Sequence, residues 1–399
     1  RSGGSSNFLR LLMSAVLAGL ALVGPAQANS ASFVRDLWPE AERAGVSRQA
    51  FEAAFASYNP IPQVIELTQK QPEFTQTVQQ YVDKRVTASQ AAKGQAMRGE
   101  WAQTLTGAEQ RYGVQPEIVL AIWGMETNFG SFMGGNNTIH ALATLTEKGY
   151  RASFFRSELV TALRIVSDGH IAPNAMVGSW AGAMGHTQFM PSSFMRYAVD
   201  YNGDGRKDIW NSVPDALGST ANYLKSFDWR PGETWGYEVK LPQGFNFAAA
   251  REMGKAPLSQ WQAMGISRAS GSAFPRPGDM ARLYLPAGAS GPAFLLLPNF
   301  DVIKRYNNSD SYALAVGHLA DRILGAGSFV TPWPAGDYAL NKAQRAEVQT
   351  LLGRAGFDVG TADGVVGPKT RAGVIAYQQA RGLPADGHVS GLLLERLKR

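Results

Sequence analysis

Residues 115–130 read QPEIVLAIWGMETNFG, and this stretch decides how the rest of the chain is interpreted. Pro116 is typical of a first helical turn, because the missing backbone N–H is not needed there. The residues that follow at helical spacing form one apolar stripe that ends in a carboxylate: Val119, Ile122, Trp123 and Glu126. The sequence therefore predicts a helix with an acid on its apolar face.

The carboxyl group of Glu126 is the first candidate for chemistry. Desolvation disfavours the charged form of a carboxyl and raises its pKa, which is what a general acid working near neutral pH requires. The alternative is a paired glutamate, or one that reaches solvent, at the end of an ordinary helix. The helix alone leaves both interpretations open.

A second unusual stretch follows about fifty residues later. Residues 178–194 read GSWAGAMGHTQFMPSSF and combine glycines with an amide, hydroxyls and aromatic rings. Such residues suit a groove for a sugar chain, whose ring faces stack on aromatics and whose hydroxyls need fixed polar partners. Taken alone, the stretch also fits a buried Met/Phe core segment.

Together the two stretches carry a resemblance. Gly124-Met-Glu-Thr-x-x-Gly130, followed by Gly182-Ala-Met-Gly-x-x-Gln-Phe-Met-Pro-Ser192, resembles the membrane-bound lytic transglycosylase B family of lysozyme-like, murein-cleaving enzymes. Similarity continues across most of residues 30–325. It includes the segments 112–114, 141–145 and 297–313.

The resemblance implies roles for particular residues. Glu126 is implied as the sole catalytic acid and base. Further side chains are implied to line the sugar subsites, and for each of them a packing role is the alternative: Tyr81, Ser179, Gln188, Tyr306, Asn307 and Tyr312.

The implied reaction cleaves peptidoglycan between N-acetylmuramic acid and N-acetylglucosamine without water and forms a 1,6-anhydro ring. A hydrolytic muramidase is one alternative, and it would want a second carboxylate roughly 5 to 9.5 Å from the first. A non-catalytic murein scaffold is another. The acids near the motifs match no catalytic position of the family: Glu117, Glu147, Glu158 and Asp168.

The tail forms a separate unit. Residues 331–338 contain two prolines and a glycine and are predicted to be a linker. Residues 339–399 predict three short helices, with Asn341 and Ser390 as N-caps and Pro368 in a first turn. The pattern of Val348-Gln-x-Leu-Leu352, Asp363-Gly-x-x-Gly367 and Tyr377-Gln-x-x-x-Gly-Leu383 resembles a peptidoglycan-binding domain. A generic helical appendage is the alternative.

The remaining segments complete a predicted α+β, mainly α fold. Residues 29–106 are helical and polar-faced, and a further helix is expected near 310–324. Between them, the alternation over 234–241 predicts a strand, and the segments 282–285 and 294–297 predict a hairpin. We therefore expect a lysozyme-like catalytic region over 29–330 with a small β-rich subdomain, followed by the three-helix module.

A calcium-like loop begins at residue 200. Residues 200–208 read DYNGDGRKD and match the first nine positions of a calcium-binding loop. Asn211 stands at position 12, where a bidentate glutamate belongs, so either Asp215 reaches in or the affinity is weak. The predicted ligands are Asp200, Asn202, Asp204, Arg206 by its backbone carbonyl, and Asp215. A turn held by its own backbone hydrogen bonds is the alternative.

Residues 1–28 are interpreted as a secretory signal. Arg10 precedes an apolar run over 11–23, and the small-x-small tripeptide 26–28 follows, whereas an uncleaved membrane anchor is the alternative. Residues 1–6, without a start Met, are a candidate cloning remnant. No lipid-acceptor cysteine follows the predicted cleavage site, so we expect a soluble periplasmic protein without a membrane span after signal removal.

Composition excludes several classes of chemistry. The 399 residues include no cysteine, and no two of the five histidines stand at i, i+4, so thiolate chemistry is excluded and a helix-borne zinc site is disfavoured. Residues 29–338 carry 27 basic and 27 acidic side chains, which disfavours nucleic-acid binding. No organic cofactor is expected. The expected partners are peptidoglycan strands and their stem peptides.

Overall fold

A computed structural model describes residues 25–69 and 75–399. The predicted signal sequence falls outside the described residues up to residue 24, as does the candidate remnant at 1–6. Residues 25–28 form the first turn of α1. Within the described ranges, no helix combines the length and apolar character needed to cross a bilayer.

Helices dominate the described residues before the predicted linker, as the sequence predicts. They run in chain order as α1 (Pro25–Arg43), α2 (Arg48–Phe55), α3 (Pro62–Gln69), α4 (Val78–Arg85), α5 (Ala88–Glu100), α6 (Ala102–Tyr112), α7 (Pro116–Thr127), α8 (Thr138–Glu147), α9 (Ala152–Ser167), α10 (Pro191–Tyr197), α11 (Val213–Ser226), α12 (Phe247–Met253), α13 (Leu258–Ala263), α14 (Pro298–Tyr306) and α15 (Asp310–Ile323). The last of these is the helix expected near 310–324.

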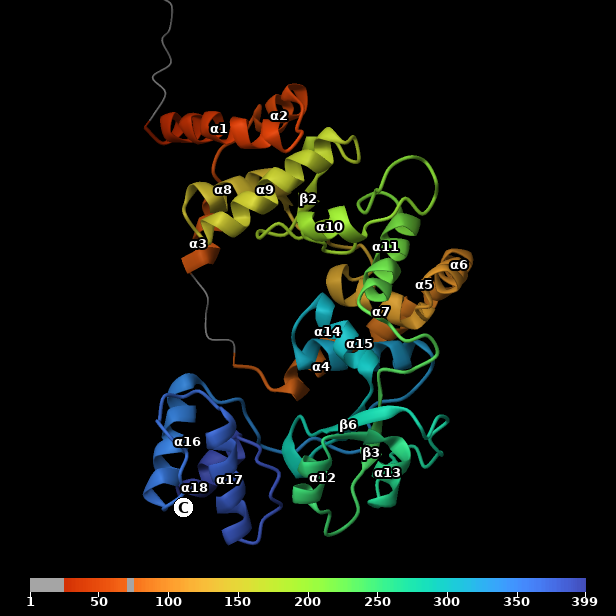
Figure 1. The fold of residues 1–399 in the computed structure, drawn as a ribbon, viewed down its shortest axis with the longest axis vertical. Helices are drawn as coiled ribbons and strands as arrows, with labels where there is room; N and C mark the ends of the chain where they lie inside the picture. The colour runs from red at the N-terminus through yellow and green to blue at the C-terminus, as the bar shows by residue number, and fades with distance from the viewer. Residues whose placement is uncertain (1–24, 70–74) are drawn as a thin grey trace, which may run out of the picture.

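The helices are layered along the long axis of the molecule (Figure 1). Helices α1 and α2 lie at one end on α9, which pairs with α8, and α10 connects this layer to α11. In the middle, α7 packs against α5, α6, α11 and α15, while α4 and α14 also pack on α15. Helix α7 therefore lies at the centre of this group of helices.

The central position of α7 refines the sequence prediction. A single apolar stripe is expected, but every residue from Ile118 to Gly124 is buried, because neighbouring helices surround this part of α7. Burying each large apolar side chain contributes about 1.5–3 kcal/mol. The helix that carries Glu126 is thus held rigidly by its surroundings.

The β-rich subdomain is one antiparallel sheet of five strands in the order β4-β6-β7-β3-β5. The strands are β3 (Gly236–Lys240), β4 (Lys255–Pro257), β5 (Ser267–Arg268), β6 (Met280–Tyr284) and β7 (Ala293–Leu296). Strands β6 and β7 form the predicted hairpin, with Arg282 opposite Leu296, and the expected turn contains a short 3-10 helix, η2 (Gly288–Ser290). The strand predicted over 234–241 is β3.

A second, two-stranded sheet lies in the helical region. Strand β1 (Asn136–Asn137) pairs antiparallel with β2 (Val177–Gly178), and a 3-10 helix, η1 (Pro173–Ala175), precedes β2. The pairing joins the chain that leaves α7 to the chain that enters residues 178–194. The two stretches that the sequence singles out are therefore connected through the backbone.

The tail module contains the three predicted helices α16 (Lys342–Arg354), α17 (Pro368–Ala380) and α18 (Gly391–Leu397). Asn341 and Ser390 cap α16 and α18 with their side chains, and Pro368 opens α17, as predicted. The module has a small core of its own around Val348, Leu352 and Val374.

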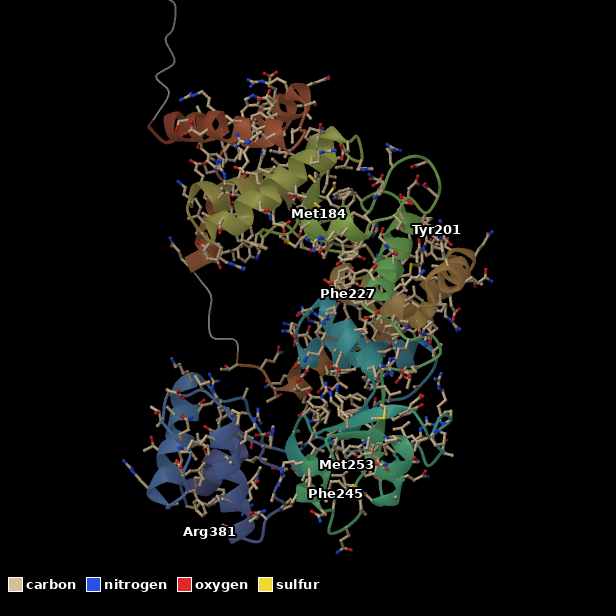
Figure 2. The ribbon with its side chains drawn as sticks, in the orientation of Figure 1. Met184, Tyr201, Phe227, Phe245, Met253 and Arg381 are labelled. Carbon is tan, nitrogen blue, oxygen red and sulfur yellow. The ribbon has the colours of Figure 1, made fainter. Side chains whose placement is uncertain are left out.

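Side chains fill three separate cores (Figure 2). The largest surrounds α7 and includes Met184, which is fully buried, with Phe227 packed at its edge. A second lies under the five-stranded sheet, where Phe245 and Met253 are at its margin. The α+β, mainly α fold class is confirmed, whereas the domain boundaries at 28, 330 and 338 stay predictions.

Candidate active site

Glu126 lies in the last turn of α7. Helix α7 begins at Pro116 and ends at Thr127, and the next two residues, Asn128 and Phe129, both have positive φ values of 49° and 56°. Left-handed backbone is costly for side chains other than glycine and is tolerated where the surroundings enforce it. The chain therefore turns sharply away directly after the acid.

Burial raises the pKa of the Glu126 carboxyl to about 7, and two weaker influences oppose that rise. One is a hydrogen bond from Tyr312, and the other is the positive charge of Arg85. The side chain is half-buried rather than sealed, so a substrate atom can approach it. A carboxyl with this pKa is divided between its acid and base forms near neutral pH, which suits proton transfer in both directions.

Three tyrosines surround the acid. The Tyr312 hydroxyl, on α15, donates a hydrogen bond to Glu126 Oε1 at 2.5 Å. Tyr306, at the end of α14, donates to the carbonyl of Thr187 at 2.7 Å. The charge of Glu126 raises the pKa of Tyr306, Tyr312 and Tyr81, in each case in addition to burial, so all three lie close to the carboxylate.

Arg85 is a site residue that the sequence analysis missed. It stands one helical turn after Tyr81 on α4, and its guanidinium lies 4.9 Å from the centre of the Tyr81 ring. Its positive charge lowers the pKa of Glu126. The i, i+4 spacing of an aromatic and a cation was the available signal.

The stretch 178–194 folds into a compact loop that is held by isolated β-bridges. Met184 bridges to both Gly178 and Phe189. Within this compact loop Gln188 has φ 53°, and its side-chain amide donates to the carbonyls of Met133 at 3.0 Å and Gly185 at 2.9 Å. The side-chain nitrogen of Gln188 therefore connects the compact loop to the loop after α7. The side-chain oxygen of Gln188 stays able to accept a hydrogen bond.

Ser179 lies at the beginning of the same compact loop. Its hydroxyl oxygen accepts hydrogen bonds from the backbone N–H groups of Ala181 at 3.3 Å and Ala183 at 3.1 Å. The hydroxyl proton stays available to donate. No hydrogen bond joins Ser179 to Glu126 in residues 25–69 and 75–399.

Asn307 is the most peripheral of the predicted site residues. It follows α14 directly after Tyr306 and is exposed to solvent. Across the described ranges, no hydrogen bond links its side chain to Glu126 or to the tyrosines. The structure thus groups Glu126, Tyr81, Tyr306 and Tyr312 closely, whereas Asn307 is exposed and makes no hydrogen bond to this group in the described residues.

His186 is a second residue that the sequence analysis missed. Trp123 donates its indole N–H to His186 Nδ1 at 3.1 Å, and Thr127 donates its hydroxyl to the His186 carbonyl at 3.0 Å. Burial lowers the pKa of His186, so the ring is neutral and can accept at Nδ1. Trp123 and Thr127 flank Glu126 on α7, so His186 fixes the turn of helix that carries the acid.

None of the four other acids near the motifs is placed beside Glu126: three bind other side chains, and Glu117 lies farther along the same helix. Glu158 accepts from the Ser192 hydroxyl at 2.6 Å, and Glu147 accepts from the Tyr58 hydroxyl at 2.8 Å. Asp168 pairs with Arg164 at 2.8 Å. Glu117 lies nine residues before Glu126 on the same helix, about 14 Å away along its axis.

The calcium-like loop lies apart from the acid, between α10 and α11. Oxygen atoms of Asp200, Asp204 and Asp215 lie within 4.8 Å of one another. Two ligands on opposite sides of a calcium ion are about 4.6 to 5.2 Å apart, so this donor set fits such an ion. Asn211 donates to Asp208 at 3.2 Å instead of facing the cluster. Asp215, rather than the residue at position 12, therefore completes the set.

The other two predicted ligands lie in the same loop. The Asn202 side-chain oxygen accepts from the Asp204 N–H at 3.0 Å, and the Arg206 guanidinium lies 3.6 Å from Asp204. Backbone N–H groups already bond the carboxylates, including those of Tyr201 and Asp208 to Asp215 at 2.8 and 2.9 Å. The turn is therefore held by its own hydrogen bonds whether or not a cation binds.

Two family descriptions match the chain. Residues 29–321 match the Transglycosylase SLT domain, and residues 341–397 match a putative peptidoglycan binding domain. Among curated proteins, the membrane-bound lytic murein transglycosylase B of Escherichia coli (strain K12) is 37% identical over 249 residues. That alignment covers 61% of this chain and 66% of the relative, so the chain spans just under two thirds of its length.

Solved structures extend the likeness to the tail. SltB3 from Pseudomonas aeruginosa, in complex with NAG-anhNAM-pentapeptide, is 45% identical with a TM-score of 0.85, and the match covers 93% of this chain and 99% of that one. The Escherichia coli lytic transglycosylase Slt35 in complex with calcium is 33% identical with a TM-score of 0.60. That match covers 74% of this chain and 92% of Slt35.

Proposed function

The chain belongs to the transglycosylase SLT domain family, and we propose on that premise that it is a lytic transglycosylase of peptidoglycan. It cleaves the β-1,4 bond between N-acetylmuramic acid and N-acetylglucosamine without water and leaves 1,6-anhydro-N-acetylmuramic acid ends. The SltB3 relative holds NAG-anhNAM-pentapeptide, a ligand of this product class, which supports the assignment.

In the first step Glu126 acts as the acid. Its proton goes to the glycosidic oxygen, the bond from that oxygen to the muramyl C1 breaks, and positive charge develops at C1. Burial keeps the carboxyl protonated to a higher pH than usual, so the proton is available near neutrality. Tyr312 holds the carboxyl in one orientation through Oε1.

In the second step the same carboxylate acts as the base. It takes the proton of the muramyl C6 hydroxyl, whose oxygen bonds to C1 and closes the anhydro ring. The nucleophile is part of the substrate and already positioned, so one carboxyl serves both steps. Arg85 stabilises the charged intermediate form of Glu126, because its positive charge lowers the pKa of that group.

The observation that carries the proposal is that no second carboxylate from residues 25–69 and 75–399 is among the groups that shift the pKa of Glu126. Burial, Tyr312 and Arg85 set that pKa. Hydrolysis by two carboxylates needs the second one roughly 5 to 9.5 Å from the first. The engagement of Glu147, Glu158 and Asp168 elsewhere supports the non-hydrolytic route over the muramidase alternative.

Digestion of purified sacculi tests the proposal. We expect mass spectrometry to show muramyl ends that are one water lighter than hydrolysed ends. Ends that carry the additional water would identify a muramidase instead. An absence of any cleavage by the purified chain, in an assay that uses the Escherichia coli lytic murein transglycosylase B as the positive control, would leave the scaffold interpretation.

The sugar subsites are also part of this proposal. Tyr306, Tyr312 and Tyr81 lie around the acid, and aromatic rings offer faces to sugar rings. Ser179 can donate and Gln188 can accept at its side-chain oxygen, as the polar subsite residues need to do. Asn307 is assigned to the rim of the same groove.

The tail module holds the enzyme on its polymer. A second binding site on one chain raises the effective concentration of the first for a shared ligand. Removal of residues 339–399 is expected to weaken sacculus binding while cleavage of soluble, peptide-free glycan continues. Equal loss of both would contradict this division of labour.

The 200–215 loop is proposed as a structural calcium site held by Asp200, Asn202, Asp204, the Arg206 carbonyl and Asp215. The donor geometry and the calcium-containing Slt35 relative support it. Calcium titration is expected to raise the melting temperature, and a flat response would remove the site. Because its substrate is the cell wall, the enzyme is proposed to work in the periplasm after export.

A further inference from the structure

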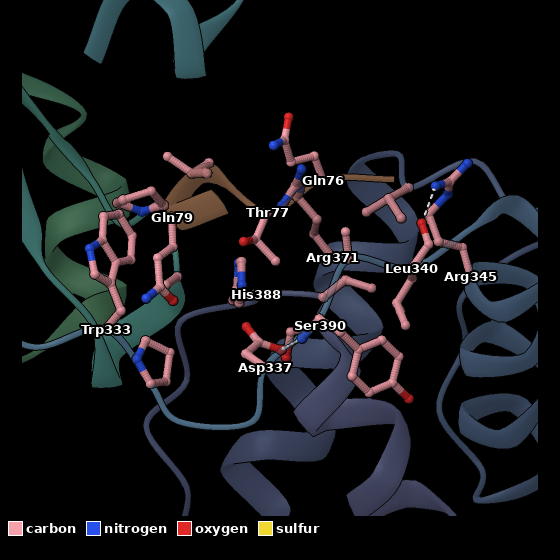
Figure 3. Close-up of a pocket in the computed structure, with 18 residues that line it drawn as sticks. Gln76, Thr77, Gln79, Trp333, Asp337, Leu340, Arg345, Arg371, His388 and Ser390 are labelled. Carbon is pink, nitrogen blue, oxygen red and sulfur yellow. Dashed lines mark hydrogen bonds between the residues drawn. The ribbon is translucent and has the colours of Figure 1, made fainter. Parts of the chain in front are cut away.

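A pocket of about 290 Å³ lies where four segments of the chain meet (Figure 3). These are the start of α4, the loop after β6, the predicted linker and the tail module. Its polar and aromatic lining includes Thr77, Gln79, Trp333, Asp337, Arg371 and His388. Neither the mechanism nor the proposed calcium site uses any of these residues.

Direct hydrogen bonds fix the module against the sheet subdomain at this pocket. Asp386 accepts from the backbone N–H of Ala289 at 2.7 Å through Oδ2 and from that of His388 at 2.8 Å through Oδ1. Arg251 donates to the carbonyl of Ala385 at 2.6 Å. The chain directly before His388 is thus anchored to the sheet subdomain, so this part of the pocket wall is preformed.

The two arginines of the pocket differ in their engagement. Arg345 donates to the carbonyls of Gly364 and Leu340, both at 2.7 Å, so it is part of the module's own structure. The guanidinium of Arg371 has no hydrogen bond or ion pair within the described part of the chain. An unpaired guanidinium beside a pocket is suited to bind a carboxylate with two parallel hydrogen bonds.

Two carboxylates, Asp337 and Asp386, lie beside the pocket, but both already accept hydrogen bonds from backbone N–H groups. The other neighbours of Arg371 favour the same ligand. His388 has its pKa lowered, first by burial and also by the charge of Arg371, while Asp386 and Asp337 oppose the shift. The neutral imidazole keeps one N–H to donate. The amides of Gln76 and Gln79 and the hydroxyl of Thr77 add donors from the opposite wall (Figure 3).

The position of the pocket connects it to the catalytic site. Thr77 caps α4, and Tyr81 follows one turn later on the same helix, about 6 Å along its axis. The charge of Glu126 reaches Tyr81. A stem peptide of five extended residues spans up to about 17 Å, whereas the α4 wall of the pocket lies only one helical turn from Tyr81.

We propose that this pocket binds the carboxylate-bearing end of a peptidoglycan stem peptide, with Arg371 as the principal anchor. The inference rests on the proposed function for the identity of the polymer. It assigns the tail module a share in substrate recognition in addition to attachment. The catalytic side contributes Gln76, Thr77 and Gln79, so the subsite is complete only when both parts are present.

Calorimetric titration of the full chain tests the proposal. The probes are a disaccharide-pentapeptide and the same disaccharide without its peptide. We expect Arg371→Ala to weaken binding of the peptide-bearing probe by roughly 10-fold or more, the change expected for a lost charge-assisted hydrogen bond. Binding of the peptide-free probe should be unchanged.

Arg354→Ala is the matched control, because it removes the same charge from an exposed position of α16 outside the pocket. Equal affinities for Arg371→Ala and Arg354→Ala would overturn the proposal, as would an equal loss for both probes. Gln79→Ala probes the opposite wall and does not depend on the folding of the module. This substitution is expected to weaken binding of the peptide-bearing probe but not of the peptide-free probe. An unchanged affinity for the peptide-bearing probe would contradict a subsite with two walls.

Turnover separates this inference from the proposed function. If the chain forms no anhydro ends but Arg371→Ala still weakens binding of the peptide-bearing probe alone, the proposed function fails and the subsite stands. If anhydro ends form and the two probes respond equally to Arg371→Ala, the subsite fails and the proposed function stands.

Discussion

Glu126 and Asp215 are both carboxylates removed from water, yet they have opposite surroundings. Asp215 is fully buried, and it accepts three backbone hydrogen bonds, from Tyr201 at 2.8 Å, Asn202 at 3.1 Å and Asp208 at 2.9 Å. Glu126 is less buried and accepts one, from Tyr312. Burial raises the pKa of both, and at Asp215 three backbone donors oppose that rise without cancelling it.

The difference teaches that burial alone does not make an acid. A carboxylate surrounded by N–H donors is stabilised in its charged form and serves structure or a cation. A carboxyl with a single donor and an apolar wall retains its proton near neutral pH and can serve catalysis. The number of donors, rather than depth, separates the two roles in this chain.

The largest expected effect is on turnover. Glu126→Gln keeps the shape of the side chain but removes the transferable proton, so we expect cleavage to fall by roughly 10²–10⁴-fold or more. The measurement is the rate of anhydro-end formation from sacculi. Glu117→Gln, at the other end of α7, is the control and should retain activity. Retained turnover in Glu126→Gln would show that Glu126 is not the catalytic acid, and the contrast with Asp215 would then fail.

The second effect is on stability. Asp215→Ala leaves three backbone N–H groups without their acceptor in a buried turn, so we expect the free energy of unfolding to fall by roughly 2–5 kcal/mol. Urea unfolding monitored by tryptophan fluorescence measures it. Asn211→Ala, which removes hydrogen bonds to Asp208 alone, should cost clearly less. Equal losses would show that Asp215 does not organise the loop.

A smaller change follows from Tyr312→Phe. The hydroxyl of Tyr312 lowers the pKa of Glu126, so its loss is expected to raise that pKa further. The alkaline limb of the pH profile of kcat/KM should move to higher pH, and the rate should fall roughly 10-fold as the carboxyl loses its fixed orientation. A reduced rate with an unmoved alkaline limb would assign Tyr312 to packing alone.

The smallest effect is the pH dependence of stability. The folded-state pKa of Glu126 lies above its unfolded value, so its favourable contribution is complete at low pH and is lost as the pH rises through about 7. Glu126→Gln removes this loss. The variant should have the same melting temperature as the wild type at pH 4 and a higher melting temperature than the wild type at pH 8. A constant difference across this range would contradict a buried, ionising carboxyl.

Much of the fold was predictable because its signals are local. Pro116 marks the beginning of α7, Asn341 caps α16, and the hairpin of β6 and β7 follows from its flanking apolar runs. The burial of α7 on all sides was not predictable from periodicity. It depends on α5, α11 and α15, which the chain supplies from distant positions.

The site was predictable in part. The apolar stripe made Glu126 a candidate, and the resemblance supplied its role and added Tyr312, which donates a hydrogen bond to it in the structure. Arg85 and His186 were missed, because their proximity to the acid or its helix arises from tertiary packing of α4 and the 178–194 stretch. The polar subsite roles of Ser179, Gln188 and Asn307 stay predictions.

The protonation of Glu126 itself tests the central claim most directly. Selective carbon-13 labelling of glutamate carboxyl groups, with Glu126→Gln to assign the signal, allows its titration to be followed by NMR in the full chain. The account predicts a midpoint near pH 7 for this one resonance. A midpoint at the ordinary value of about 4.3 would contradict it, because the carboxyl would then be ionised and unable to donate a proton at neutral pH.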